Sequence, residues 1–259
     1  MLSNGTTISS IAGADVASSL HAGSCNRILQ QRCPACFGGG MYGRSLSCGA
    51  DFHNCVDGNF HHCHIKAAGQ CPKFFDPEYM LPKEFVDSVG TRIEAARRSH
   101  PKAYQPIVPD EAVNECEESH EAADMKKQKA TMERFDDTGL MFLVCRHDIP
   151  LFCTNIDTPG EHQKHFFSLI PPHATVAMLY DIGCVLDRSL SLYDILPEHI
   201  TRRLLFATSA MHAYGHQWSC QLHYNPRLRE GLGLTDGEGV DRLWSRLRKI
   251  IGITRTSAN

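Results

Sequence analysis

Three apolar runs in the second half of the chain most strongly limit what it can fold into. Residues 140–145 and 150–156 are separated by a short polar stretch, which predicts a β-hairpin. Residues 175–183 form a third run, with Asp181 near its end, and residues 53–60 predict another short buried strand. Because a hairpin excludes a purely parallel sheet, we expect an α/β fold in which helices flank a mixed sheet.

Helical patterns lie between and after these strands. Helical spacing or composition occurs in residues 85–96, 110–124, 160–170, 202–213 and 240–251. The stretch 202–213 is also compatible with a strand. Seven of the fifteen residues from 110 to 124 are acidic, which is typical of a solvated helix. Residues 61–136 are rich in loops and charges, so we expect a helical and loop insertion between the first and second strands.

The composition excludes several classes of protein. The chain has 259 residues, of which 42% are hydrophobic and 21% charged, close to the average of soluble domains, so disorder and coiled coil are excluded. No apolar window is long enough for a transmembrane helix, and no membrane is expected as a partner. The net charge of −3 gives no general basic surface for nucleic acid. Residues 1–30 are low in complexity, and we expect a flexible leader there.

Cysteine and histidine are unusually frequent, with 12 and 15 residues. The chain is far longer than the small secreted domains that disulfides staple, and its first residues make a poor signal peptide. We therefore expect a reduced, intracellular protein. In that setting a cysteine beside a histidine is a metal ligand, a catalytic thiol or a buried residue.

The cysteine-rich segment 31–56 contains one pair with zinc-ligand spacing, Cys33 and Cys36. The sequence leaves open which residues complete a site with this pair. The candidates are Cys25, Cys48, Cys55 and His53.

Two further zinc sites are compatible with the spacing. Cys116 and His120 in the insertion can join Cys145 and His147 after the strand, which would fix the insertion to the sheet. Another group shares one face if its stretch is helical, and it comprises His212, His216, Cys220 and His223. The alternative is that these histidines are packed or contact DNA phosphate.

Three carboxylates occupy positions suited to metal chemistry. Asp57 lies in a predicted strand, Asp181 at the end of another, and Glu238 at the start of a helix. Phosphoryl transfer with two metal ions needs carboxylates that converge from separate rigid elements, and Mg²⁺ needs only a few of them. An ordinary role is also open, since acids at a helix start cap it and interact with its dipole.

Seven sequence blocks, in order from about Cys33 to Ile251, resemble the Kyakuja-Dileera-Zisupton (KDZ) transposases, which are abundant in fungal genomes. The blocks are 57–62, 69–72 with 81–83, 137–140 with 145–147, 180–184, 212–221, 224–227, and 233–239 with 242–244. The resemblance implies a ribonuclease-H-like fold with an Asp-Asp-Glu (DDE) triad that acts in cut-and-paste DNA transposition with Mg²⁺ or Mn²⁺. The triad positions of the family match Asp57, Asp181 and Glu238.

The resemblance also sets expectations for organisation and partners. It implies a catalytic domain over residues 57–259, the ends of a transposon and target DNA as partners, a homo-oligomer in the full-length form, and a nuclear location. Because members of the family are usually much longer, we expect a fragment. Basic residues that could neutralise DNA phosphates, or simply form an exposed helix face, are Arg227, Arg242, Arg246 and Lys249.

A second interpretation belongs to another class of protein. The chain could be a transposase-derived DNA-binding or interaction protein that is stabilised by zinc and has no catalytic activity. Strand cleavage that depends on Mg²⁺ or Mn²⁺ distinguishes the two interpretations.

Overall fold

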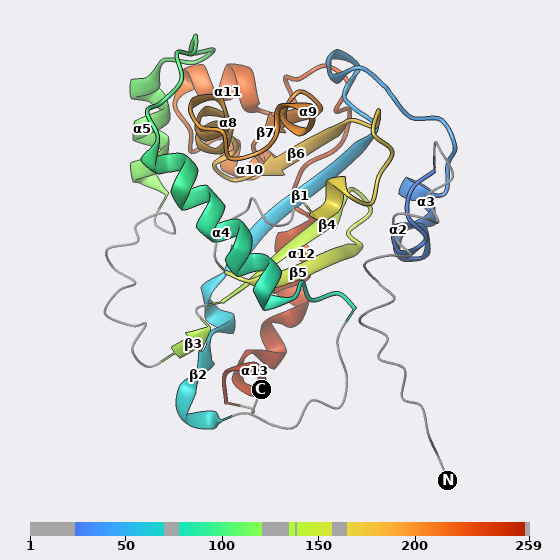
Figure 1. Ribbon diagram of the computed structural model, residues 1–259, viewed down its shortest axis with the longest axis vertical. Helices are drawn as coiled ribbons and strands as arrows, with labels where there is room; N and C mark the ends of the chain where they lie inside the picture. The colour runs from blue at the N-terminus through green and yellow to red at the C-terminus, as the bar shows by residue number, and fades with distance from the viewer. Residues whose placement is uncertain (1–23, 70–77, 121–134, 138, 157–164, 257–259) are drawn as a thin grey trace.

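A mixed five-stranded sheet forms the centre of the computed structural model, which describes residues 24–69, 78–120, 135–137, 139–156 and 165–256 (Figure 1). The strands follow the order β5-β4-β1-β6-β7. Pairing is antiparallel between β1 and β4 and between β4 and β5, and parallel between β1 and β6 and between β6 and β7. The bounds are β1 (Phe52–Asn59), β4 (Leu140–Cys145), β5 (Pro150–Asn155), β6 (Val176–Tyr180) and β7 (Leu204–Ala207). The predicted mixed sheet and its hairpin are confirmed.

Helices cover both faces of this sheet. In Figure 1 α4 crosses the near face and α12 lies behind the sheet. The helices are α2 (Arg27–Arg32), α3 (Pro34–Phe37), α4 (Lys83–Arg98), α5 (Asp110–Ser119), α8 (Gly183–Leu192), α9 (Glu198–Thr201), α10 (Ala210–Ala213), α11 (Trp218–Tyr224), α12 (Gly239–Leu247) and α13 (Ile251–Thr256). Short 3₁₀ helices span Leu46–Cys48, Phe60–His62, Lys66–Ala68 and Arg248–Ile250, and a small antiparallel pair joins β2 (His64–Ile65) to β3 (Phe135–Asp137).

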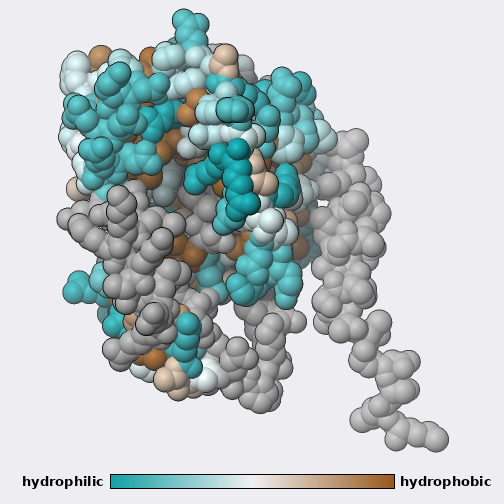
Figure 2. Space-filling model, turned by 60° about the vertical axis from the view of Figure 1, so that its left-hand side comes forward, coloured by the Kyte–Doolittle hydropathy of each residue, from teal (hydrophilic) through white to brown (hydrophobic). Residues whose placement is uncertain are grey.

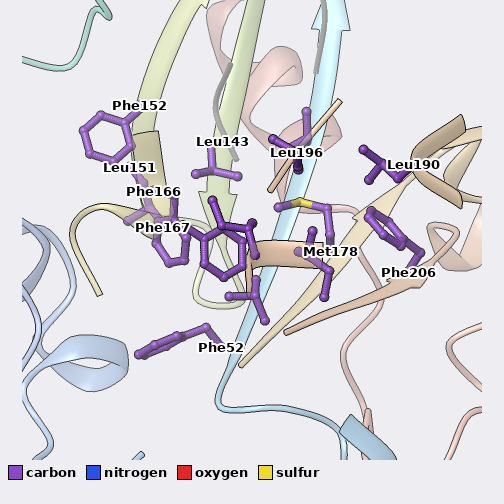
Figure 3. Packing of buried hydrophobic residues seen from close by; sticks show 14 of the residues in the cluster. Phe52, Leu143, Leu151, Phe152, Phe166, Phe167, Met178, Leu190, Leu196 and Phe206 are labelled. Atoms are coloured by element: carbon purple, nitrogen blue, oxygen red, sulfur yellow. The ribbon is translucent and has the colours of Figure 1, made fainter. Parts of the chain in front are cut away.

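Strand alternation divides the core into two clusters. Phe52, Val56 and Met178 belong to the larger cluster, on the face that α4 and α8 cover, and Figure 3 shows the apolar side chains gathered there. The intervening residues, such as Cys55 and Leu179, belong to the smaller cluster with Val240 and Trp244 of α12. Full burial of one large apolar side chain stabilises the fold by about 1.5–3 kcal/mol. The α12 face is therefore a second packed layer, and it also receives Asp57 and Asp181, which share the parity of Cys55 and Leu179.

Most of the predicted helices are present, with different bounds. The helix expected over 85–96 is α4, and that over 110–124 is α5, which ends at Ser119. Of the helix expected over 160–170, residues 160–164 lie outside the described part of the chain, while Phe166 and Leu169 are buried. For 202–213 the strand alternative holds at the centre, which is strand β7, and only α10 near its end is helical. All four residues of β7 are buried, and a short run that is apolar on every side does not distinguish a strand from a buried helix.

The chain folds from an earlier residue than the sequence indicates. Residues 24–30 were expected in the leader, but Cys25 and Leu29 are buried and α2 begins at Arg27. The boundary expected at residue 57 falls inside β1, so the cysteine-rich segment and the carboxylates share one strand. Residues 61–136 do connect neighbouring strands, since β4 follows them and pairs with β1.

The surface around α5 is polar. The side of the molecule where α5 lies is mostly hydrophilic, with smaller apolar areas between (Figure 2). This agrees with the acidic, solvated character expected for α5. Among the described residues, none of the helices has the length and hydrophobicity needed to cross a bilayer.

Candidate active site

Strand register brings the first two predicted carboxylates together. Val56 of β1 pairs with Tyr180 of β6, so the residues that follow, Asp57 and Asp181, are neighbours on adjacent parallel strands. Such strands lie about 4.8 Å apart. Asp57 contacts Trp244 of α12, and the charge of Asp181 acts both on Asp57 and on Asp241 of α12. The end of the sheet beside α12 is therefore the candidate active site.

Asp57 is fixed by Trp244 of α12. The Trp244 Nε1–H donates to Asp57 Oδ2 at 2.9 Å. The indole ring stacks on His62, with 5.3 Å between centroids, and meets the edge of Phe142 at 5.1 Å. Burial raises the pKa of Asp57 to about 7, and the negative charges of Asp181 and Asp241 add to the rise. The site therefore concentrates negative charge that a cation would stabilise.

Asp181 is 6% exposed and is surrounded by donors. The Ser209 hydroxyl donates to its Oδ1 at 2.7 Å, His212 Nδ1 lies 3.1 Å from the same oxygen, and His120 Nε2 lies 3.9 Å from Oδ2. Burial acts to raise the pKa of Asp181, but hydrogen bonding by His120, the charge of His212 and the Ser209 hydroxyl outweigh it, so the pKa lies below its usual value. Asp181 is thus held ionised and oriented.

Glu238 lies at the start of α12, where it is the N-cap residue. Its Oε1 accepts from the backbone N–H of Met211 at 2.7 Å. Its carboxylate, that of Asp241 and the His212 ring offer ligand atoms within 4.8 Å of one another. Burial, Asp181 and Glu238 raise the pKa of Asp241 to about 6. Asp241 is a fourth acid that the sequence interpretation missed, although its spacing of three from Glu238 places both on one helix face.

A glycine permits the close approach of α12 to the sheet. A Cβ on Gly239, directly after Glu238, would lie 2.8 Å from Asp148 Oδ1 and 3.1 Å from Cys55 Sγ. Any other residue would force the Asp148 side chain or the start of the helix to shift. The Gly-Glu-Gly sequence therefore has a structural reason beyond helix capping.

The first cysteine and histidine cluster, here the hairpin quartet, comprises Cys33, Cys36, Cys145 and His147. Its ligand atoms lie within 4.8 Å of one another. The Sγ atoms of Cys33 and Cys36 are 3.5 and 3.2 Å from His147 Nδ1. The pair comes from the α2–α3 junction, and its partners come from the end of β4 and the turn that follows.

The second cluster, here the helical quartet, comprises Cys116 of α5, Cys184 of α8, and His216 and Cys220 at α11. Its ligand atoms also lie within 4.8 Å, and Cys184 Sγ is 3.5 Å from His216 Nδ1. All cysteines of the described residues are free thiols. Three thiols and one imidazole are a ligand set that tetrahedral zinc takes in structural sites, so both quartets can hold zinc.

The expected ligand groupings are corrected by these clusters. Cys33 and Cys36 are joined by Cys145 and His147 rather than by the residues considered from the sequence, which were Cys25, Cys48, Cys55 and His53. Cys116 does not meet Cys145 and His147, because the insertion lies against α8 and α11 instead.

Three of the histidines expected as zinc ligands lie outside both quartets. His120 and His212 are not in a quartet but contact Asp181. His223 packs its ring against Tyr224. Cys184, a member of the helical quartet, was not predicted.

The four basic residues expected at DNA differ in their surroundings. Arg242 donates to Asp148 at 2.6 and 2.7 Å and to Asp236 at 2.9 and 3.2 Å, so two acids offset its charge and it braces the loop before α12. Arg227, Arg246 and Lys249 are exposed. These three side chains can contact DNA phosphates.

Comparison with protein families gives a match over most of the chain. The sequence matches the model of the Kyakuja-Dileera-Zisupton transposase over residues 50–259. The comparisons with curated proteins and with solved structures find no match. The matched range holds the four acids, their histidine partners and the whole helical quartet. Because it covers most of the chain, the chain belongs to the KDZ transposase family.

Proposed function

We propose that this chain is a metal-dependent catalytic domain that cleaves and joins DNA strands in cut-and-paste transposition, with Asp57, Asp181 and Glu238 as its DDE triad. The observation that carries the proposal is the placement of Asp57 on β1 beside Asp181, which directly follows the adjacent parallel strand β6. Membership of a transposase family supports the same reaction class.

The topology supports a ribonuclease-H-like core. The first strand, β1, lies at the centre of the sheet, with an antiparallel hairpin on one side and two parallel strands on the other. This arrangement brings a carboxylate from the first strand next to one from a strand much later in the chain. We take it as the scaffold of the triad.

The residues present fit Mg²⁺ or Mn²⁺. Carboxylate oxygens are the ligands these cations prefer, and here they converge from β1, the end of β6 and α12. Trp244 donates to Oδ2 of Asp57 and orients this carboxylate. When bound, the metal ions would activate the attacking oxygen and stabilise the leaving oxygen.

The side chains around the triad hold it in place for this reaction. Ser209 and His212 orient Asp181, and the backbone N–H of Met211 orients Glu238. The proposed chemistry is in-line attack by water on a DNA phosphorus at an element end, followed by attack of the freed 3′-hydroxyl on target DNA. Arg227, Arg246 and Lys249 would contact the phosphate backbone without reading sequence. In the cell we expect action in the nucleus, and as a homo-oligomer in the full-length form.

The test is strand cleavage by the purified chain with Mn²⁺ or Mg²⁺, using supercoiled plasmid DNA. We expect metal-dependent nicking that falls to background in Asp181→Asn, which removes the charge but keeps the shape of the side chain. The matched control is Asp87→Asn, an exposed acid of α4 paired with Lys83, which should nick like the unmodified chain. DNA binding without cleavage, unchanged in Asp181→Asn, would instead identify a transposase-derived binding protein.

A further inference from the structure

The helical quartet touches Asp181 through one imidazole ring. His216 Nδ1 faces Cys184 Sγ at 3.5 Å, and His216 Nε2 lies 2.7 Å from the carbonyl oxygen of Asp181. A carbonyl only accepts, so Nε2 carries the proton, and in the neutral ring Nδ1 then keeps its lone pair toward the thiols. Cys184 itself follows Asp181 by three residues, in the first turn of α8.

We propose that the helical quartet binds a structural zinc ion and that this zinc site positions Asp181. A zinc-bound histidine usually donates its second ring N–H to a carboxylate or a backbone carbonyl, which fixes its tautomer and orientation. His216 already has this arrangement, with the Asp181 carbonyl as acceptor. The bond ties the backbone of a catalytic residue to a metal ligand.

The insertion supplies a second connection. Cys116 lies in the last turns of α5, and His120 caps the same helix four residues later. Cys116 Sγ also accepts from the backbone N–H of Gln217 at 3.3 Å, beside His216. Fixing Cys116 to α8 and α11 therefore fixes the end of α5, where His120 Nε2 lies 3.9 Å from Asp181 Oδ2.

The donor set fits zinc. Cys116, Cys184 and Cys220 are buried and free, and they converge on one imidazole. Their segments are far apart in sequence, so an ion that joins them closes long loops and stabilises the folded state. Hard cations such as Mg²⁺ prefer oxygen ligands and do not suit three thiols.

Zinc content of the purified full chain tests the site. Cys220→Ser should lower the bound zinc, measured by inductively coupled plasma mass spectrometry, by one ion per chain. The matched control is Cys153→Ser, a buried thiol outside both quartets, which should keep the zinc content of the unmodified chain. Equal zinc in Cys220→Ser and the unmodified chain, or a disulfide between quartet cysteines in the freshly purified protein, would overturn the proposal.

A second pair of variants tests the positioning role, which rests on the proposed function. His216→Cys keeps four zinc ligands but removes the hydrogen bond to Asp181. Cys220→His keeps four zinc ligands and also keeps that hydrogen bond. We expect zinc in each, with Mn²⁺ affinity, measured by electron paramagnetic resonance titration, reduced about 10–100-fold only in His216→Cys. Unchanged Mn²⁺ affinity in His216→Cys would overturn the positioning role. If the unmodified chain holds zinc in this quartet but binds no Mn²⁺, the proposed function and the positioning role fail while the zinc site stands.

Discussion

The hairpin quartet and the helical quartet have the same four ligand types but occupy different ends of the sheet. Cys145 of the hairpin quartet pairs with Asn54, three residues before Asp57 on β1, which is about 10 Å along a strand. The helical quartet instead reaches the Asp181 carbonyl directly. Identical ligand chemistry can therefore serve different purposes, depending on what lies beside it.

The elements that each quartet joins show the same contrast. The hairpin quartet ties α2 and α3 to the turn between β4 and β5. The helical quartet ties α5, α8 and α11 together around the end of β6. We expect loss of the first to lower stability alone, and loss of the second to change the carboxylate site as well.

The largest effect is expected for the double variant Cys33→Ser/Cys36→Ser. Structural zinc contributes about 10–16 kcal/mol to the folding of zinc-finger peptides. Here a large core remains, so we expect a loss of about 3 kcal/mol or more, roughly 6–12 °C in Tm. The Mn²⁺ affinity of the folded protein should not change. Cys48→Ser, an exposed thiol outside both quartets, is the control. A fall in Mn²⁺ affinity as large as in His216→Cys would remove the distinction between the quartets.

A smaller effect is expected for Trp244→Phe. Trp244 approaches the carboxylates from α12. The change removes the hydrogen bond to Asp57 and keeps an aromatic ring against His62 and Phe142. A hydrogen bond to a charged group contributes about 1.5–3 kcal/mol, so Mn²⁺ affinity should fall about 10-fold or more. The zinc content should stay that of the unmodified chain. Unaltered Mn²⁺ binding would show that Trp244 does not orient Asp57.

The smallest effect is a pH dependence on the hairpin-quartet side of the molecule. His165 packs against Phe85 and Phe152, and burial together with the Arg32 charge lowers its pKa to about 4. The unfolded chain, with a pKa of about 6.5, binds the proton first, so folding stability falls as pH drops below about 6.5, by about 1 kcal/mol between pH 6.5 and 5.5.

Thermal unfolding at several pH values checks this. His165→Phe should lose part of the acid sensitivity, seen as a shallower decline of Tm between about pH 6.5 and 5.5. The difference between the two proteins matters, because protonation of quartet thiols affects both equally. Parallel declines would show that His165 is not buried as described.

Local patterns carried much of the fold prediction. The hairpin and the strand before Asp181 were predicted because apolar runs with polar boundaries are local signals. The resemblance then selected Asp57, Asp181 and Glu238 from 29 acids. The structure brings Asp57 and Asp181 together through strand register, while Glu238 lies with Asp241 and with His212, which contacts Asp181.

Long-range pairing could not be predicted in the same way. Cys33 and Cys36 show zinc spacing, but nothing local indicates that α2 and α3 pack beside the end of β4. Cys184 has no partner nearby in sequence, since Cys116, His216 and Cys220 all lie at least 32 residues away. For strand β7 the sequence left helix and strand open for a different reason, because its burial on all sides hides its period.

Anomalous X-ray scattering from crystals of the full chain grown with Mn²⁺ would locate the bound metal. We expect manganese density in contact with the carboxylates of Asp57, Asp181 and Glu238, and none there in Asp181→Asn. Zinc density should lie separately in each quartet. Manganese that binds away from these carboxylates, or that stays at them in Asp181→Asn, would show that they do not form the metal site.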